Sequence, residues 1–423
     1  MTTSHRLPCV EEIRAHFPAL QRMHRGQRIA YFDGPGGTQV PQQVVDAMAD
    51  YLLNHNANTG WAYPTSEETD ALISAARAVL AALLHAAPHE VAFGANMTTL
   101  TFHLARALGR GWGPGDEVII TELDHHANQA PWRALEKERG ITIRVVPLDL
   151  ETYELDWGAL ERAVTAKTRL LAIGAGSNAL GTMPDVAKAT ELAHDAGALC
   201  FVDAVHYTPH GVVDVQAIDC DFLACSAYKF YGPHIGVLYG KADRLAALDV
   251  PRLEPAPDTV PERLETGTQN HEGIVGAAAA VHFLGSLGSG HDHRAQLVSA
   301  MNGLHAREGQ LFARMWEGLG AIKGITRHGP PPGRPRTPTI SFTIDGITPE
   351  AAARALAEQA VFVSHGDYYA STIVERLGLQ PHGMIRAGCS CYTTEDEVER
   401  LIAGVAMISS SFRAGSPFSI ARV

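Results

Sequence analysis

Short apolar runs alternate with helical patterns of polar and apolar residues along the first part of the chain. Each run has the length of a buried strand, and helical patterns at 98–108, 132–139 and 184–196 lie between successive runs. Buried strands that are separated by helices are typical of a mainly parallel sheet. The sequence therefore predicts an α/β domain with strands at 91–95, 117–121, 141–147, 168–174, 198–204, 221–226 and 236–240.

The pattern changes after residue 285, where a loop rich in Gly, Ser and His precedes a long helical stretch that ends near Leu319. The proline-rich piece at 328–338 should be an extended loop. Beyond it we expect a smaller α+β domain with a loop through Tyr369. Its predicted elements are strands at 339–344, 360–365 and 383–389, helices at 349–359 and after Tyr369, and a final helix from about Thr394. We thus predict a large domain at 31–285, a small domain at 286–423, and an N-terminal segment, 1–30, that packs with the small domain.

Composition restricts the class of protein. The 423 residues are 46% hydrophobic and carry a formal net charge of −12, which fits a globular enzyme and argues against binding to nucleic acid or membrane surfaces. We see neither an apolar stretch of signal-peptide type nor one of membrane-spanning length. The six cysteines are too dispersed for a disulfide scaffold, so we expect a reducing, cytoplasmic location.

Lysine chemistry has few candidates, because the chain contains only six lysines. Lys229 follows an apolar strand that ends at Ser226, and a lysine placed there loses solvation, so that its amine can act as nucleophile or base. Upstream, Asp203 stands at the carboxyl end of another buried run, where parallel sheets place ligand groups. A protonated pyridine nitrogen would be a suitable partner for that carboxylate. The alternatives are a snorkelling lysine and an aspartate that caps the next helix.

A helix that begins between Asn96 and Thr99 directly after a strand is a potential anion site, since its free N–H groups and its dipole favour negative charge. The same residues could simply be N-caps. The chain has neither a GxGxxG nor a GxxxxGKS/T motif, so the usual signatures of dinucleotide and P-loop nucleotide binding are missing.

Taken in order, these features resemble the pyridoxal phosphate (PLP) enzymes of fold type I, specifically the class V aminotransferase and cysteine desulfurase group. The resemblance is carried by seven motifs: YFDGPGGTQVP (31–41), ELDHHANQAPW (122–132), GSNALGT (176–182), VDAVH (202–206), SAYKFYGP (226–233), ETGTQN (265–270) and IRAGCSCYTTEDEVERL (385–401). It implies a large domain with a mainly parallel sheet, a smaller C-terminal domain, PLP as cofactor, and a homodimer whose active site is shared between subunits.

The resemblance also implies roles for residues around the cofactor ring. Lys229 would hold PLP as a Schiff base and move protons at the substrate's Cα. Asp203 would bind the pyridinium, and His125 would stack on the ring. Asn178 and His206 match residues that contact the ring's phenolic oxygen, and Asn178 also matches a substrate contact. The family usually has glutamine where this chain has His206.

Further roles concern the phosphate and the substrate. Arg386 matches the arginine that binds the substrate carboxylate, although a structural ion pair is an alternative. Tyr228 stands where desulfurases commonly have histidine. The remaining phosphate ligands would be Met97, Thr98, Ser226 and, from the second subunit, Thr268.

One stretch departs from the persulfide-forming desulfurases. VFVSHGDYYA places Tyr369 where those enzymes have their loop cysteine, and Ser364 where an arginine is common. A phenol cannot accept sulfane sulfur as a thiolate does, and Cys389 and Cys391 are of the type that usually only packs. We therefore expect a desulfurase-like lyase that cleaves a bond at Cβ of a small amino acid without a persulfide, with Tyr369 hydrogen-bonding the departing group.

Other functions stay open at this point. They are an aminotransferase or epimerase of the same group, a non-catalytic PLP-binding protein, and an unrelated α/β enzyme. A metal site at His125 and His126 is not expected, because neighbouring residues of a strand would point to opposite faces.

Overall fold

The computed structural model describes residues 7–414. A seven-stranded sheet forms the centre of the large domain, with the strand order β4-β10-β9-β8-β7-β5-β6. β10 runs antiparallel to both of its neighbours, and the other pairs are parallel. The seven strands are Val91–Gly94 (β4), Glu117–Thr121 (β5), Thr142–Val146 (β6), Thr168–Gly174 (β7), Leu199–Asp203 (β8), Phe222–Ser226 (β9) and Gly236–Gly240 (β10). All seven predicted strands of the α/β domain are confirmed.

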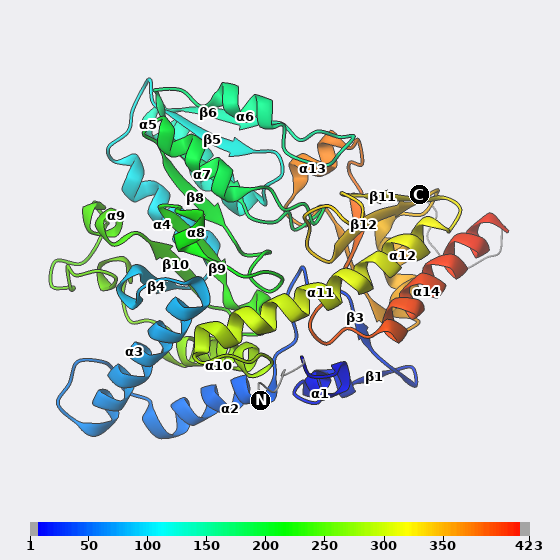
Figure 1. Cartoon of the computed structure of the whole chain (residues 1–423), viewed down its shortest axis with the longest axis horizontal. Helices are drawn as coiled ribbons and strands as arrows, with labels where there is room; N and C mark the ends of the chain where they lie inside the picture. Colours follow the sequence, from blue (N-terminus) through cyan, green and yellow to red (C-terminus); the bar gives the residue numbers. More distant parts are fainter. Residues whose placement is uncertain (1–6, 415–423) are drawn as a thin grey trace.

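Helices cover both faces of this sheet, as Figure 1 shows. Successive strand residues point to opposite faces, so Ile119 belongs to one hydrophobic cluster while Val118 and Ile120 belong to the other. The helices on the Val118 side are α4 (Met97–Gly109) and α5 (Ala130–Arg139). Those on the Ile119 side are α3 (Pro64–Leu84), α7 (Val186–Asp195) and α10 (His271–Ser286). Near-continuous apolar strands are what a sheet buried on both faces requires.

The small domain has a four-stranded antiparallel sheet with the order β11-β12-β15-β14. Its strands are Ile325–His328 (β11), Thr339–Ile344 (β12), Ser364–Gly366 (β14) and Met384–Gly388 (β15). Its helices are α12 (Pro349–Ala357), α13 (Ser371–Arg376) and α14 (Glu395–Arg413). The long helix α11 (His293–Gly320) runs from beside the large domain to the small one (Figure 1).

Two details differ from the sequence-based expectation. β11 was not predicted. The single strand expected at 360–365 is divided between two sheets, because Val361–Phe362 (β13) pairs with Ala30–Tyr31 (β3), whereas β14 pairs with β15. The remaining elements are Val10–Arg14 (α1), Met23–His24 (β1), Gln27–Arg28 (β2), Gln42–Asp50 (α2), Trp157–Ala163 (α6), Val215–Ile218 (α8) and Ala242–Ala247 (α9). None of the helices within residues 7–414 is long and apolar enough to cross a membrane.

Candidate active site

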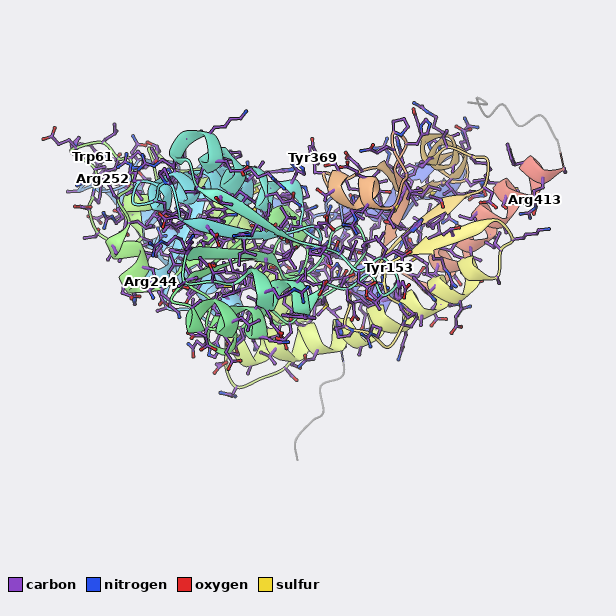
Figure 2. All side chains as sticks on the ribbon, turned by 90° about the horizontal axis from the view of Figure 1, so that it is seen from above. Trp61, Tyr153, Arg244, Arg252, Tyr369 and Arg413 are labelled. Carbon is purple, nitrogen blue, oxygen red and sulfur yellow. The ribbon has the colours of Figure 1, made fainter. Side chains whose placement is uncertain are left out.

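Two adjoining cavities lie at the carboxyl ends of the parallel strands. The inner cavity, of about 590 Å³, is lined from the ends of β7, β8 and β9 and the start of α4. The outer cavity, of about 640 Å³, adds residues of the small domain. Six residues line both: Thr98, His125, Ala127, Asn178, Tyr228 and Lys229. Tyr369 lies where the two domains meet (Figure 2). The structure thus brings together the predicted site residues of the two domains, with one exception.

That exception is Thr268. It is exposed and lines a third cavity, of about 710 Å³, together with Trp61 and Arg252. Figure 2 shows Trp61 and Arg252 at the far end of the large domain from Tyr369. Within one chain, Thr268 therefore lines neither the inner nor the outer cavity.

Lys229 is presented by a tight turn, Ala227–Lys229, directly after β9. Its Nζ donates hydrogen bonds to the carbonyl oxygens of Pro35 and Gly36, the latter at 2.9 Å. Burial, followed by the positive charge of Arg386, lowers the pKa of Lys229 to about 7. A substantial share of this amine is therefore neutral near pH 7, which is the form that acts as nucleophile or base.

Asp203 ends β8 and is buried, and its Oδ1 accepts a hydrogen bond from the Val205 N–H at 2.9 Å. Burial raises the pKa of this carboxyl to about 6. A second buried carboxyl, Asp124, has its pKa raised to about 7, first by burial and then by the charge of Asp203. Its Oδ2 accepts from the hydroxyl of Thr121 at 2.9 Å. Asp124 lies within the ELDHHANQAPW motif, but the sequence pattern alone indicates no role for it.

His125 and His126 lie on a loop and a 3₁₀ turn (His126–Asn128), so the expectation that they belong to a strand is wrong. The His125 Nδ1 accepts from the Ala127 N–H at 2.9 Å, and burial, then Lys229, lowers the pKa of His125 to about 4. Its ring is therefore neutral, and its centroid lies 5.5 Å from that of Tyr369. Within residues 7–414 no group of three His, Cys, Asp or Glu side chains is arranged to hold a metal ion.

Asn178 and His206 face the cavities from the large domain but are fixed by the small one. The Asn178 Nδ2 donates to the carbonyl oxygen of Tyr368 at 2.9 Å, while its buried Oδ1 has no hydrogen-bond partner among the residues described. The His206 Nε2 lies 3.0 Å from the hydroxyl of Thr337 and 3.1 Å from that of Thr339. Burial holds the pKa of His206 well below its usual range, so this ring is also neutral.

The predicted anion site is the first turn of α4. Asn96 is its N-cap and accepts from the Thr99 N–H at 2.9 Å, so the capping alternative also holds. The Met97 N–H donates to the Ser226 hydroxyl at 3.0 Å. Beside this turn the ring of Tyr228 stacks on His234, with centroids 5.0 Å apart and planes 17° apart. His234 lines the inner cavity, and sequence reasoning missed it.

Arg386 lies on β15, is buried, and lines the outer cavity. Its guanidinium donates to the Asn178 carbonyl at 3.0 Å and to the Ser364 hydroxyl at 3.1 Å, and its Nη2 lies 3.4 Å from Asp33. The guanidinium also packs over the ring of Tyr368, with its Cζ 4.2 Å from the ring centroid. These contacts fix the plane of the guanidinium, and the half-exposed Asp33 is an ion-pair partner that sequence reasoning did not name.

The loop at Tyr368 and Tyr369 is strained, because both residues have left-handed backbones with φ of 55° and 57°. Non-glycine residues rarely adopt this conformation, which costs about 1–2 kcal/mol per residue. Two hydrogen bonds to the large domain hold the loop: Asn178 to the Tyr368 carbonyl, and the His126 N–H to the Tyr369 carbonyl at 2.8 Å. The Tyr369 side chain is 73% exposed at the outer cavity.

Known proteins resemble this chain over nearly its whole length. The family model described as "Aminotransferase class-V" matches residues 30–401. A cysteine desulfurase of Dickeya dadantii is 32% identical over 412 residues, covering 94% of this chain and 96% of that protein. The chain belongs to the class-V aminotransferase family.

Solved structures agree with this family. An apo cysteine desulfurase from Thermococcus onnurineus superimposes with a TM-score of 0.87 at 26% identity, covering 96% of this chain and 99% of that one. A mutant of the enzyme C-DES, solved with glycine linked to PLP, superimposes with a TM-score of 0.77 at 21% identity. The match covers 93% of this chain and 98% of that one, and it shows a likeness of fold alone. The protein is a PLP-dependent, cysteine desulfurase-like class-V enzyme of fold type I, as the resemblance implied.

The inner cavity of this class-V enzyme fits PLP. The carboxyl of Asp203, whose pKa is raised by burial, suits a protonated ring nitrogen that would restore its charge. The Asn178 Oδ1, which has no hydrogen-bond partner among the residues described, and the neutral His125 ring also line this cavity. The first turn of α4 suits the phosphate, and Lys229 suits the aldehyde carbon. Each part of the cofactor thus has a complementary group in this cavity.

The carboxyl pair Asp124 and Asp203 predicts how apo-protein stability depends on pH. Both carboxyls have a folded-state pKa above their ordinary 3.8, so at intermediate pH the folded state binds more protons than the unfolded state. The contribution of these two carboxyls to stability should therefore fall as pH rises from about 4 to about 7, whereas histidines of lowered pKa, such as His125 and His206, contribute with the opposite sign. Thermal melts of the apo-protein at about pH 5 and about pH 8 check this contribution: the melting temperature of Asp124→Asn relative to wild type should be a few degrees higher at about pH 8 than at about pH 5. Asp195→Asn, at an exposed position, is the matched control. An unchanged difference in Asp124→Asn would contradict the assignment.

Proposed function

We propose that this class-V enzyme is a lyase that cleaves a bond at Cβ of a small α-amino acid without forming a cysteine persulfide. The observation that carries the proposal is the position of the thiols. Cys200, Cys220, Cys225, Cys389 and Cys391 are buried, and burial raises the pKa of each of them. Cys9 is exposed but stands at the start of α1. None of the described residues lining the two cavities is a cysteine; Tyr369 lines the outer cavity instead.

The residues around the outer cavity support this chemistry. Arg386 presents a fixed guanidinium for the substrate carboxylate. Lys229, with its lowered pKa, can take the proton from Cα, so that the bond from Cβ to the leaving group can break. PLP, when bound, supplies the electron sink for that step. The Tyr369 hydroxyl lies on the exposed side, where it can donate a hydrogen bond to the group that departs from Cβ.

Replacing Tyr369 by phenylalanine tests the last role. The variant keeps the ring that packs near His125 and removes only the hydroxyl, so we expect kcat to fall by about 10-fold or more while amino-acid affinity changes little. Steady-state kinetics with the best substrate measures kcat and KM separately, and so shows which of the two changes. Full turnover in the variant would refute the role of the hydroxyl.

The proposed function is tested by a screen of small amino acids, including those that contain sulfur and selenium, with released products and cofactor spectra followed together. A lyase should release the Cβ leaving group together with an α-keto acid and ammonia. Treatment of the folded enzyme with a thiol-alkylating reagent should leave turnover intact, since Cys9 is the one exposed cysteine. Loss of activity on alkylation, or a protein persulfide found by mass spectrometry, would contradict the proposal. Conversion of PLP to its amine form without release of a leaving group would identify an aminotransferase instead, and racemised substrate an epimerase.

The proposal includes a homodimer in which Thr268 of one chain completes the partner's phosphate site. The exposed position of Thr268, outside both active-site cavities of its own chain, supports this arrangement. Trp61 and Leu253, which line the third cavity together with Thr268, are large apolar side chains that are exposed. Further exposed apolar side chains lie on α2 and on the turn that follows α2: Val45, Leu52 and Leu53. Light scattering coupled to size-exclusion chromatography should give the mass of a dimer, and a monomer that binds PLP at full affinity would contradict the proposal.

A further inference from the structure

The inner cavity contains three imidazoles, and two of them are already engaged. His125 accepts a backbone hydrogen bond, and His206 lies between two threonine hydroxyls. The third, His234, has an exposed ring and lines the cavity beside the first turn of α4.

The backbone places His234 next to that turn. Two residues later, Gly236 begins β10 and packs so closely on the helix N-cap that a Cβ there would lie 2.5 Å from the carbonyl carbon of Asn96. The segment that carries His234 is thus in close contact with Asn96, the N-cap of α4. The N–H and hydroxyl of Thr98 and the Ser226 hydroxyl, which accepts from the Met97 N–H, form the part of the cavity that suits an anion.

The ring of His234 is oriented by Tyr228. The two rings stack nearly parallel, and Gly37 also lies against Tyr228, since a Cβ at Gly37 would be in van der Waals contact with the tyrosine ring at 3.4 Å. Thr38 fixes the Tyr228 backbone, because its N–H donates to the Tyr228 carbonyl at 3.1 Å. The imidazole of His234 is therefore held between the Tyr228 ring and the part of the cavity beside the first turn of α4.

We propose that His234, stacked on Tyr228, donates a hydrogen bond to the phosphate of PLP. An imidazole N–H that binds a phosphate oxygen forms a charge-assisted hydrogen bond, and the N-terminus of α4 favours the same anion. Tyr228 is a positioning residue in this arrangement, whose ring fixes the plane of the imidazole. This contact would affect cofactor binding and does not depend on which reaction the enzyme performs.

Comparing PLP with pyridoxal, which lacks the phosphate, tests the proposal. Equilibrium dissociation constants are measured by tryptophan fluorescence for the apo wild type, His234→Ala and His234→Phe. The phenylalanine variant keeps the stack on Tyr228 and removes only the hydrogen-bond donor. Both variants should bind PLP about 10- to 100-fold more weakly, with pyridoxal affinity unchanged.

The controls distinguish the possible roles. His291→Phe, which replaces an exposed imidazole in the loop before α11, should leave both affinities unchanged. Wild-type PLP affinity in His234→Phe would overturn the proposal and assign His234 a packing role alone. An equal loss for PLP and pyridoxal would also overturn it, because the phosphate would then not be the group recognised.

Discussion

Replacement of Lys229 by alanine is expected to abolish turnover, lowering kcat by about 10³-fold or more, because general acid–base catalysis alone contributes about 10²–10⁴-fold. The same variant should lose covalent attachment of PLP. Reduction with borohydride followed by mass spectrometry should fix the cofactor on a peptide containing Lys229 in the wild type and leave the variant unlabelled. The buried amine, with its pKa lowered to about 7, is the physical basis of both effects.

Lys229→Arg is the matched control for this prediction. It keeps a cation near the Pro35 and Gly36 carbonyls, but a guanidinium stays protonated near pH 7 and is a poor nucleophile. It should therefore be as inactive as the alanine variant while binding PLP more tightly than that variant does. A reducible link to PLP in either variant would contradict the assignment of Lys229.

Replacement of Arg386 by lysine is expected to raise KM for the amino acid by about 100-fold, because a bidentate charge-assisted contact to the carboxylate is lost. The effect on kcat should be smaller, since Arg386 contacts the carboxylate and not the bond that breaks. Steady-state kinetics with the best substrate measures both parameters. The three contacts that fix the guanidinium, to Asn178, Ser364 and Asp33, are what an ammonium cannot reproduce together.

The amine that corresponds to the substrate, with the carboxylate removed, tests the reason for this effect. Wild type should prefer the amino acid strongly over that amine, and Arg386→Lys should lose most of the preference. Arg376→Lys, at an exposed arginine that pairs with Glu122, is the matched control and should keep it. An undiminished preference in Arg386→Lys would mean that Arg386 serves as the structural partner of Asp33 alone.

Much of the fold could be predicted because the central strands are buried on both faces. A run such as EVIIT is wholly buried, and its apolar character identifies it without any knowledge of its neighbours. β11 was missed because Ile325–His328 mixes exposed and buried positions. The strand expected at 360–365 divides because its two halves pair with different partners, and pairing partners far along the chain leave no local signal.

The candidate site divides in the same way. Lys229 and Asp203 could be predicted because each stands at or just after the end of a buried strand, where the polar residue stands out. Asp33 is important because it contacts Arg386, which lies far along the chain. Asp124 is important because it is buried near a second carboxyl, that of Asp203. The residue types alone show neither relation. His234 lies one residue beyond the SAYKFYGP motif, and only the stacked geometry connects it with the cavity.

The anchoring of the Tyr369 loop bears on how product leaves the enzyme. The carbonyl groups of Tyr368 and Tyr369 are bonded to Asn178 and His126 of the large domain, so the loop is tied across the mouth of the outer cavity at two adjacent points. A carrier arm that delivers sulfur to an acceptor protein must swing out of its site with the cargo attached. This loop has no thiol to carry it, and its two hydrogen bonds to the large domain would have to break for it to move. In the proposed lyase, the group cleaved from Cβ would therefore depart by diffusion into solvent, and no docked acceptor would be needed to complete a cycle.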